Sequence, residues 1–288
     1  MKKITVALLV MAMLAVFAGC GEKPLSEAEL RGLLEAEITL PILDFWYDDY
    51  DGNGAFEAFA FVGEEQNPEM DEGYRGEIWF VNCDGAQQLE ASPHGIYWGL
   101  IDTYRFDGRN FAAATTFAQT GGLVNIWGVY AGEPRHESIS NIGGGLKQID
   151  DKNFTLWHSA YDFDVTDGVT TGHTWKDYWF YWDGEAFHEY GGAAVTEEQL
   201  RKCDGAAEIL DAIIATGETI GDIFYRGNGI INVNHLRTYE SGRSNYHTIL
   251  QLSGTEVTVV EVEGNGGFYL PALAPGIAVC PELPEIFA

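Results

Sequence analysis

Short runs of apolar residues, separated by polar turn residues, recur along most of this chain and predict β-strands. Ten runs rich in aromatic and β-branched residues have this character. They cover residues 56–62, 77–82, 111–118, 124–130, 154–160, 177–182, 223–225, 230–234, 246–252 and 257–263. We therefore expect a mainly β fold of antiparallel strands from residue 42 onward.

Two stretches have the spacing of helices instead. A capping box in residues 26–29, followed by leucines at helical spacing, predicts a short N-terminal helix over about residues 25–37. A second capping box in residues 196–199 opens one inserted helix, which ends at Gly217. Gly205 lies inside this second stretch, where it could split the helix in two.

Acidic tight turns separate many of the predicted strands. Asp-Gly or Asp-Asp pairs occur at residues 84–85, 107–108, 150–151 and 183–184, each after an apolar strand end. Asp-Gly favours the positive φ angles that tight hairpin turns need. The pairs recur at irregular intervals, which suggests degenerate hairpin units such as the blades of a propeller. We therefore predict a propeller-like antiparallel β-repeat domain, with a sandwich or another β architecture as the alternative.

The first 19 residues have the character of a secretory signal peptide. Two lysines precede an apolar stretch over residues 4–17, which is short for a membrane-spanning helix. The segment Phe17-Ala18-Gly19-Cys20 resembles the lipobox of bacterial lipoproteins, although Phe17 stands where that family usually has Leu. The resemblance implies cleavage before Cys20 and a diacylglyceryl thioether on its sulfur. The alternative is ordinary cleavage after Ala18, which would release a soluble protein.

Lipidation would divide the chain into three parts. These are a lipoprotein signal peptide over residues 1–19, a lipidated cysteine with a short tether over 20–24, and a single β-rich domain over 25–288. Two or three acyl chains, such as palmitate, would hold the protein stably at the cell membrane. The domain would then lie close to the membrane on its extracytoplasmic side.

The chain is strongly acidic, with 44 Asp and Glu residues against 16 Lys and Arg residues and a formal net charge of −28. This balance argues against nucleic acid as a partner, because contacts to phosphate need cationic side chains. It favours the binding of divalent metal ions. Apart from Cys20, the chain has Cys83, Cys203 and Cys280, whose wide spacing matches no metal-ligand pattern. We expect each of these three to be a small buried residue.

The segment over residues 49–57 is the clearest candidate for a functional site. Side-chain oxygens recur at alternate positions in Asp49, Asp51 and Asn53, and again at Glu57. Glycines between them allow the chain to curl so that these oxygens converge. Calcium takes about six to eight oxygen ligands, and an acidic cluster repels itself without a cation. The spacing predicts a structural Ca²⁺ site, and the alternative is a solvated acidic hairpin turn.

This segment resembles calcium loops of the D-x-[DN]-x-[DN]-G type. It departs from the EF-hand, because the twelfth position is Ala60 instead of Glu and no helices are evident beside the loop. It is more similar to the loops of FG-GAP and VCBS repeats, in which the segment runs into a β-strand and the ninth position, here Glu57, is acidic. The resemblance covers about residues 44–63. It implies a β-propeller or related β-repeat fold, a structural Ca²⁺ and a role in adhesion or ligand display.

Two further stretches carry weaker signals. The acidic stretch over residues 162–168 has loose spacing, and we expect it to be a solvated loop. In the aromatic stretch over residues 175–190, Trp179 and Tyr181 share one face of a strand and the intervening aromatic residues share the other. An exposed aromatic row would stack on sugar rings, whereas a buried row belongs to the core. We favour the core.

Motifs of common enzymes are absent from the sequence. It holds no H-E-x-x-H zinc motif, no G-x-S-x-G nucleophile elbow and no Gly-rich phosphate loop after a strand. We therefore expect no catalytic residues. The chain is predicted to be a membrane-anchored lipoprotein that binds Ca²⁺ and acts as a binding or interaction module for a glycan or a protein. An extracellular carbohydrate-active enzyme is the alternative, because 44 acidic residues always offer carboxylate pairs; a purely structural envelope protein is a third possibility.

Overall fold

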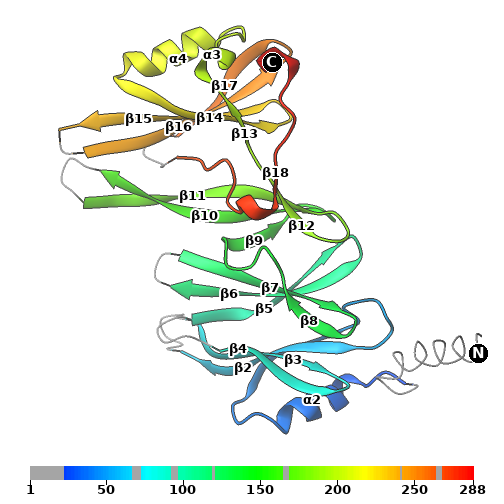
Figure 1. Cartoon of the computed structure of the whole chain (residues 1–288). Coiled ribbons are helices and arrows are strands. Elements are labelled where there is room, and N and C mark those ends of the chain that lie inside the picture. Colours follow the sequence, from blue (N-terminus) through cyan, green and yellow to red (C-terminus); the bar gives the residue numbers. More distant parts are fainter. Residues whose placement is uncertain are drawn as a thin grey trace, which may run out of the picture. The chain divides into compact units, whose positions relative to one another are not determined.

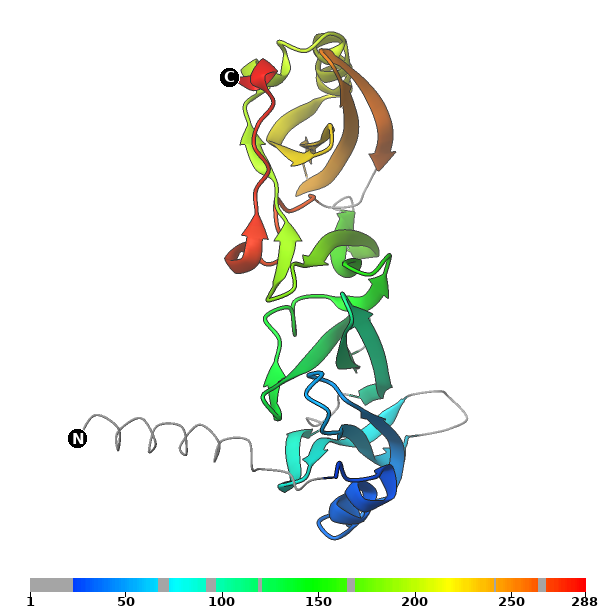
Figure 2. The same cartoon turned by 90° about the vertical axis from the view of Figure 1, so that its right-hand side faces the viewer.

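Antiparallel strands form most of the chain that the computed structural model describes. The described residues are 23–66, 73–91, 97–118, 121–164, 169–240, 242–263 and 268–288. They fall into two compact units, the first ending at Asn141 and the second beginning at Ile142 (Figures 1 and 2). The expected single domain over residues 25–288 is thus divided, and each unit has hydrophobic clusters of its own.

The described residues of the first unit form one helix and eight strands. These are α2 (Glu27–Glu35), β1 (Ile42–Asp48), β2 (Glu57–Glu65), β3 (Tyr74–Asn82), β4 (Gly85–Ala91), β5 (Tyr97–Phe106), β6 (Arg109–Ala118), β7 (Gly121–Tyr130) and β8 (Glu133–His136). Strands β1–β4 form one antiparallel meander and β5–β8 form a second. The two meanders join into one sheet where Tyr74 of β3 pairs with Trp98 of β5.

Strand β2 is buried on both faces, because apolar residues occupy successive positions along it. Phe59 and Phe61 point into a cluster with aromatic residues of the second meander. The alternate positions, such as Ala60, contact Leu30 and Leu34 of α2. The predicted capping box starts this helix, since the Glu29 carboxylate accepts the N–H of Ser26 at 2.8 Å.

The described strands of the second unit form two sheets. The first consists of β9 (Gly144–Gln148), β10 (Asn153–Asp164), β11 (Val169–Trp182), β12 (Phe187–Tyr190) and the short parallel strand β18 (Ala278–Val279). The second is a meander of β13 (Ala193–Val195), β14 (Glu218–Gly227), β15 (Ile230–Tyr239), β16 (Gly242–Ser253) and β17 (Glu256–Glu263). Two 3-10 turns, η1 (Pro275–Ile277) and η2 (Glu285–Phe287), lie near the C-terminus.

The inserted helix is divided at Gly205, as the sequence suggested. The two pieces are α3 (Glu197–Leu200) and α4 (Ala206–Ala215), and Gly205 between them has a φ of 82°. This left-handed conformation suits glycine and turns the chain between the two helices. Leu200 and Leu210 are fully buried against the second sheet, so the pair of helices covers its apolar face.

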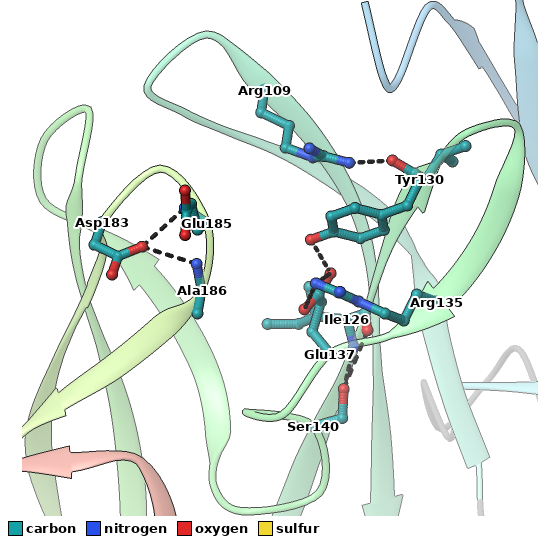
Figure 3. A network of polar contacts seen from close by, with 10 residues as sticks. Arg109, Ile126, Tyr130, Arg135, Glu137, Ser140, Asp183, Glu185 and Ala186 are labelled. Atoms are coloured by element: carbon teal, nitrogen blue, oxygen red, sulfur yellow. Dashed lines mark hydrogen bonds and ion pairs between the residues drawn. The ribbon is translucent and has the colours of Figure 1, made fainter.

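The four predicted acidic turns all connect consecutive antiparallel strands, namely β3–β4, β5–β6, β9–β10 and β11–β12. Asp107 and Gly108 have φ angles of 49° and 82°, as a two-residue hairpin requires. In the β11–β12 turn, Asp183 accepts the N–H groups of Glu185 and Ala186, each at 2.8 Å (Figure 3). These bonds, with a further one from His188, lower the pKa of Asp183 to about 2.

The expectation of a mainly antiparallel β fold is confirmed. Nine of the ten predicted strands lie within observed strands, and the tenth, over residues 56–62, begins one residue before β2. Among the described residues no closed barrel or propeller is detected, so the expected propeller-like arrangement is not confirmed. No helix in this part of the chain is long and apolar enough to cross a lipid bilayer.

Candidate metal centre

The acidic segment forms the connection between β1 and β2 in the first unit. Gly52 and Gly54 have φ angles of 72° and 85°, which turn the chain back on itself. The Asp49 Oδ2 atom accepts the N–H of Gly54 at 3.0 Å, and the Asp51 Oδ1 atom accepts the N–H of Asn53 at 3.2 Å. The loop is thus curled around its own carboxylates.

Three of the four predicted ligands come together. Asp49, Asp51 and Glu57 each place an oxygen within 4.8 Å of the others. Glu57, at the first position of β2, is 1% exposed, and the Oδ1 atom of Asp49 is buried without a hydrogen-bond partner. The fourth residue, Asn53, is exposed, and its Oδ1 atom accepts the N–H of Ala55 at 2.6 Å.

The cluster is electrostatically unfavourable by itself. Burial raises the pKa of Glu57 to about 7, with the negative charges of Asp51 and Asp49 acting in the same direction and a hydrogen bond from the Tyr50 N–H opposing them. The ion pairs of the described residues include none between this cluster and a Lys or Arg. A divalent cation would fit the oxygen donors and relieve the repulsion.

Turns from distant parts of the first unit contact this loop. The Asp51 Oδ2 atom accepts the N–H of Gly132, in the β7–β8 turn, at 2.9 Å. Asn110, at the start of β6, donates to Asp48 Oδ2 at 2.8 Å, and Asn82 donates to the Gly132 carbonyl at 3.0 Å. The loop therefore lies where the two meanders meet. Nothing in the local sequence around these partners indicated this.

A polar network holds the β7–β8 hairpin that contacts the loop (Figure 3). The guanidinium groups of Arg109 and Arg135 lie 3.8 and 3.5 Å from the centre of the Tyr130 ring. The Tyr130 hydroxyl donates to Glu137 at 2.6 Å, and Arg135 pairs with the same carboxylate at 3.2 Å. Since Tyr130 is two residues from Gly132, this network positions the N–H group that Asp51 accepts.

The aromatic stretch of β11 has both an exposed and a buried face. Tyr178, Phe180 and Trp182 are buried, whereas Trp175 and Trp179 are 55% and 45% exposed. The alternation predicted from the sequence is present. The expectation that the stretch belongs to the core is right for one face and wrong for the other, because two tryptophans occupy the positions that point to solvent.

The remaining candidates are the cysteines after Cys20 and the acidic stretch over residues 162–168. Cys203 is buried as expected, whereas Cys280 is exposed, and both are free. Cys83 is half-buried and disulfide-bonded, so the expectation of a small buried residue is right for Cys203 alone. The cluster of the β1–β2 loop is the one group of three metal-ligating side chains found in the described part of the chain. The signal peptide over 1–19 and the lipidation site Cys20 lie outside the residues that the structure describes. In the acidic stretch over 162–168, residues 162–164 extend β10 instead of forming the expected loop, and residues 165–168 lie outside the described residues.

Comparisons with known proteins give no relatives. No protein-family model, no curated protein and no solved structure matches this chain. A function is therefore inferred from the chemistry of the chain's own residues.

Proposed function

We propose that this protein is an extracytoplasmic lipoprotein, held at the cell membrane through Cys20, that binds Ca²⁺ structurally and acts as a binding module. The observation that carries the calcium site is the unpartnered, buried Oδ1 atom of Asp49 beside the carboxylates of Asp51 and Glu57. Carboxylates and loop carbonyls are the oxygen donors that Ca²⁺ prefers. The lipobox-like sequence before Cys20 supports the anchor.

The metal's role in this proposal is structural. The loop connects β1 to β2 and also contacts the β7–β8 turn through Asp51. A bound cation would let Glu57 ionise without penalty and would tie the two meanders together. Tight hairpins between short antiparallel strands support the further proposal of a propeller-like β-repeat protein, related in kind to FG-GAP and VCBS repeats.

A carbohydrate-active enzyme is the second candidate, because Asp150 and Asp177 line an aromatic pocket of the second unit. A general acid for glycoside cleavage needs a raised pKa. Asp150 is fully exposed, and hydrogen bonds from the Asn153 side chain and from the N–H groups of Lys152 and Asn153 lower its pKa. These contacts favour binding over hydrolysis.

Thermal unfolding with Ca²⁺ and with a chelator tests the metal site. We expect Ca²⁺ to raise the melting temperature of the chain from residue 21 onward, because a ligand at about 100 times its Kd stabilises the native state by about 2.7 kcal/mol. Asp49→Asn should abolish this rise. Asp84→Asn, the same change in the β3–β4 turn of the same unit, should retain it. Equal responses of the two variants, or no response of the unchanged protein, would contradict the proposal.

A further inference from the structure

The second unit contains a pocket of about 540 Å³ between its two sheets. Residues of β11, β12, β14, β15 and β16 line it, together with Tyr269 from the segment that follows β17. Tyr269 exchanges two backbone hydrogen bonds with the Asn234 side chain of β15, and the Leu270 N–H donates to the Tyr178 hydroxyl of β11 at 3.0 Å. This segment therefore runs from one sheet to the other (Figure 1). Pockets of roughly 300–1,000 Å³ are typical of small-molecule sites.

Arg226 of β14 brings an unpartnered cation to this pocket. Both of its terminal nitrogens, Nη1 and Nη2, are buried and have no hydrogen-bond partner among the described residues. Its guanidinium carbon lies 5.2 Å from the centre of the Tyr269 ring and 5.4 Å from that of the Tyr178 ring. These rings interact with the positive charge but provide no hydrogen-bond acceptor for the terminal N–H groups. A buried guanidinium without acceptors is unfavourable, so an anionic acceptor would bind well here.

The carboxylate of Glu189, which interacts electrostatically with Arg226, is already hydrogen-bonded to other groups. Glu189 of β12 is fully buried, and its two oxygens accept the N–H groups of Leu273 and Ala274, each at 2.6 Å. It interacts with Arg226 electrostatically without a hydrogen bond. The donor positions of Arg226 therefore stay open to a ligand.

Asn232 of β15 supplies a second polar group without a hydrogen-bond partner among the described residues. Its side chain lines the pocket, is 1% exposed, and has an Oδ1 atom without a hydrogen-bond partner in the described part of the chain. A buried carbonyl oxygen of this kind requires a hydroxyl or N–H donor. The ligand thus needs both an anionic acceptor and a neutral donor.

Aromatic rings form the outer wall. Trp179 and Tyr190 line the pocket and are 45% and 38% exposed. The Tyr190 ring is fixed, since its hydroxyl donates to Asn153 at 2.9 Å and it packs against Tyr181 at 4.7 Å between ring centres. Half-exposed rings of this kind offer flat apolar surfaces on which the face of a sugar ring can pack.

We propose that this pocket binds a carboxylate-bearing sugar, with its carboxylate on Arg226, a hydroxyl donating to Asn232 and its ring against Trp179. The inference rests on the proposed binding-module function and names the ligand class of that module. A neutral sugar would offer the guanidinium no charged acceptor, and a simple inorganic anion would make no packing contact with the aromatic rings. Asp177, an exposed acceptor at the rim, suits the remaining hydroxyl groups.

Calorimetric titration of the full mature chain tests the proposal with matched probes: D-glucuronate and D-galacturonate against D-glucose, D-galactose and inorganic phosphate. We expect a uronate to bind at least about tenfold more tightly than its neutral counterpart, since hydrogen bonds to a charged group carry about 1.5–3 kcal/mol. Phosphate should bind weakly. Absence of uronate binding, or equal binding of the neutral sugar or of phosphate, would overturn the proposal.

Two pairs of variants locate the binding. Arg226→Met should lose uronate affinity, whereas Arg201→Met, in the same unit but paired with Glu197 and Asp211, should retain it. Because Arg226→Met could disturb folding, the exposed Trp179→Ala is compared with Trp175→Ala, which changes the neighbouring exposed tryptophan of β11. Uronate affinity that survives Trp179→Ala unchanged, or falls equally in both tryptophan variants, would overturn the proposal.

The metal site and the pocket can fail independently. The titration is repeated with a chelator in place of Ca²⁺, and uronate binding should persist, because the pocket and the acidic loop belong to different units. A negative calcium result with uronate binding intact would remove the metal site alone. Loss of uronate binding in the chelator would contradict the assignment of the ligand to this pocket.

Discussion

At the scale of single residues, the raised pKa of Glu57 predicts how the free energy of unfolding depends on pH in the absence of metal. Its pKa in the folded chain is about 7, above the ordinary value of 4.5, so the protonated form stabilises the fold. This contribution is complete below pH 4.5 and is lost as the pH rises through about 7. With a chelator, the free energy of unfolding should fall by about 3 kcal/mol over this range relative to Glu57→Gln, which stays neutral.

Urea unfolding of both proteins at several pH values measures this difference. With Ca²⁺ the trend should weaken or reverse, because the cation favours the ionised carboxylate. A constant difference between the two proteins from pH 4.5 to pH 8 in the chelator would show that Glu57 does not titrate in the expected range.

The spacing of Asp49, Asp51 and Glu57 was sufficient to predict their convergence, because nine residues of loop bring them together through local turns. Their distant partner Gly132 was not predictable. It contributes a backbone N–H, which every residue except proline carries, and only the pairing of the strands decides where that group lies. Arg226 was missed for a similar reason, since nothing adjacent in sequence indicates that it lacks a partner.

At the scale of elements, the β7–β8 hairpin supports the loop through Tyr130. Tyr130→Phe removes the hydrogen bond to the buried carboxylate of Glu137 and should lower the free energy of unfolding by about 1–2 kcal/mol. Tyr74→Phe is the matched control, because the Tyr74 hydroxyl has no hydrogen bond within the described residues, and should cost less than about 0.5 kcal/mol. Chemical denaturation compares them, and equal losses would speak against the role of this bond.

Elements with a local signal were predicted well. The capping boxes predicted the starts of α2 and α3, and the Asp-Gly pairs predicted hairpin turns. Both features depend only on hydrogen bonds or φ angles within a few consecutive residues, so they can be read from the local sequence. The β7–β8 turn was missed, since it is made by Ala131 and Gly132 without Asp or Asn, and Ala131 has a φ of 55°. Strand β4 was missed because it is rich in Ala, Gln and Glu and has no β-branched or aromatic residue.

At the scale of the whole molecule, the division into two units escaped prediction because it follows from contacts between strands and not from composition. The residues around Asn141 resemble other turns of the chain, and no Pro-rich or charged linker separates the units there. Whether meanders stay open or close is decided in the same way, by which strand edges pair. The Asp-Gly turns therefore predicted the hairpins correctly, whereas the predicted propeller-like arrangement is not confirmed.

Hydrogen exchange measured by mass spectrometry would show whether each ligand acts on its own unit. Calcium should slow exchange in the β1–β2 loop and the β7–β8 turn, where the N–H groups of Gly54 and Gly132 bond to the acidic cluster. Uronate should slow exchange around β14 and Tyr269, which line the pocket. Because binding stabilises only the cooperative unit that contains the site, calcium should leave the peptides after Ile142 unchanged. If calcium slowed exchange equally in both units, the two units would unfold as one cooperative unit. The metal site and the pocket would then be thermodynamically coupled and not independent.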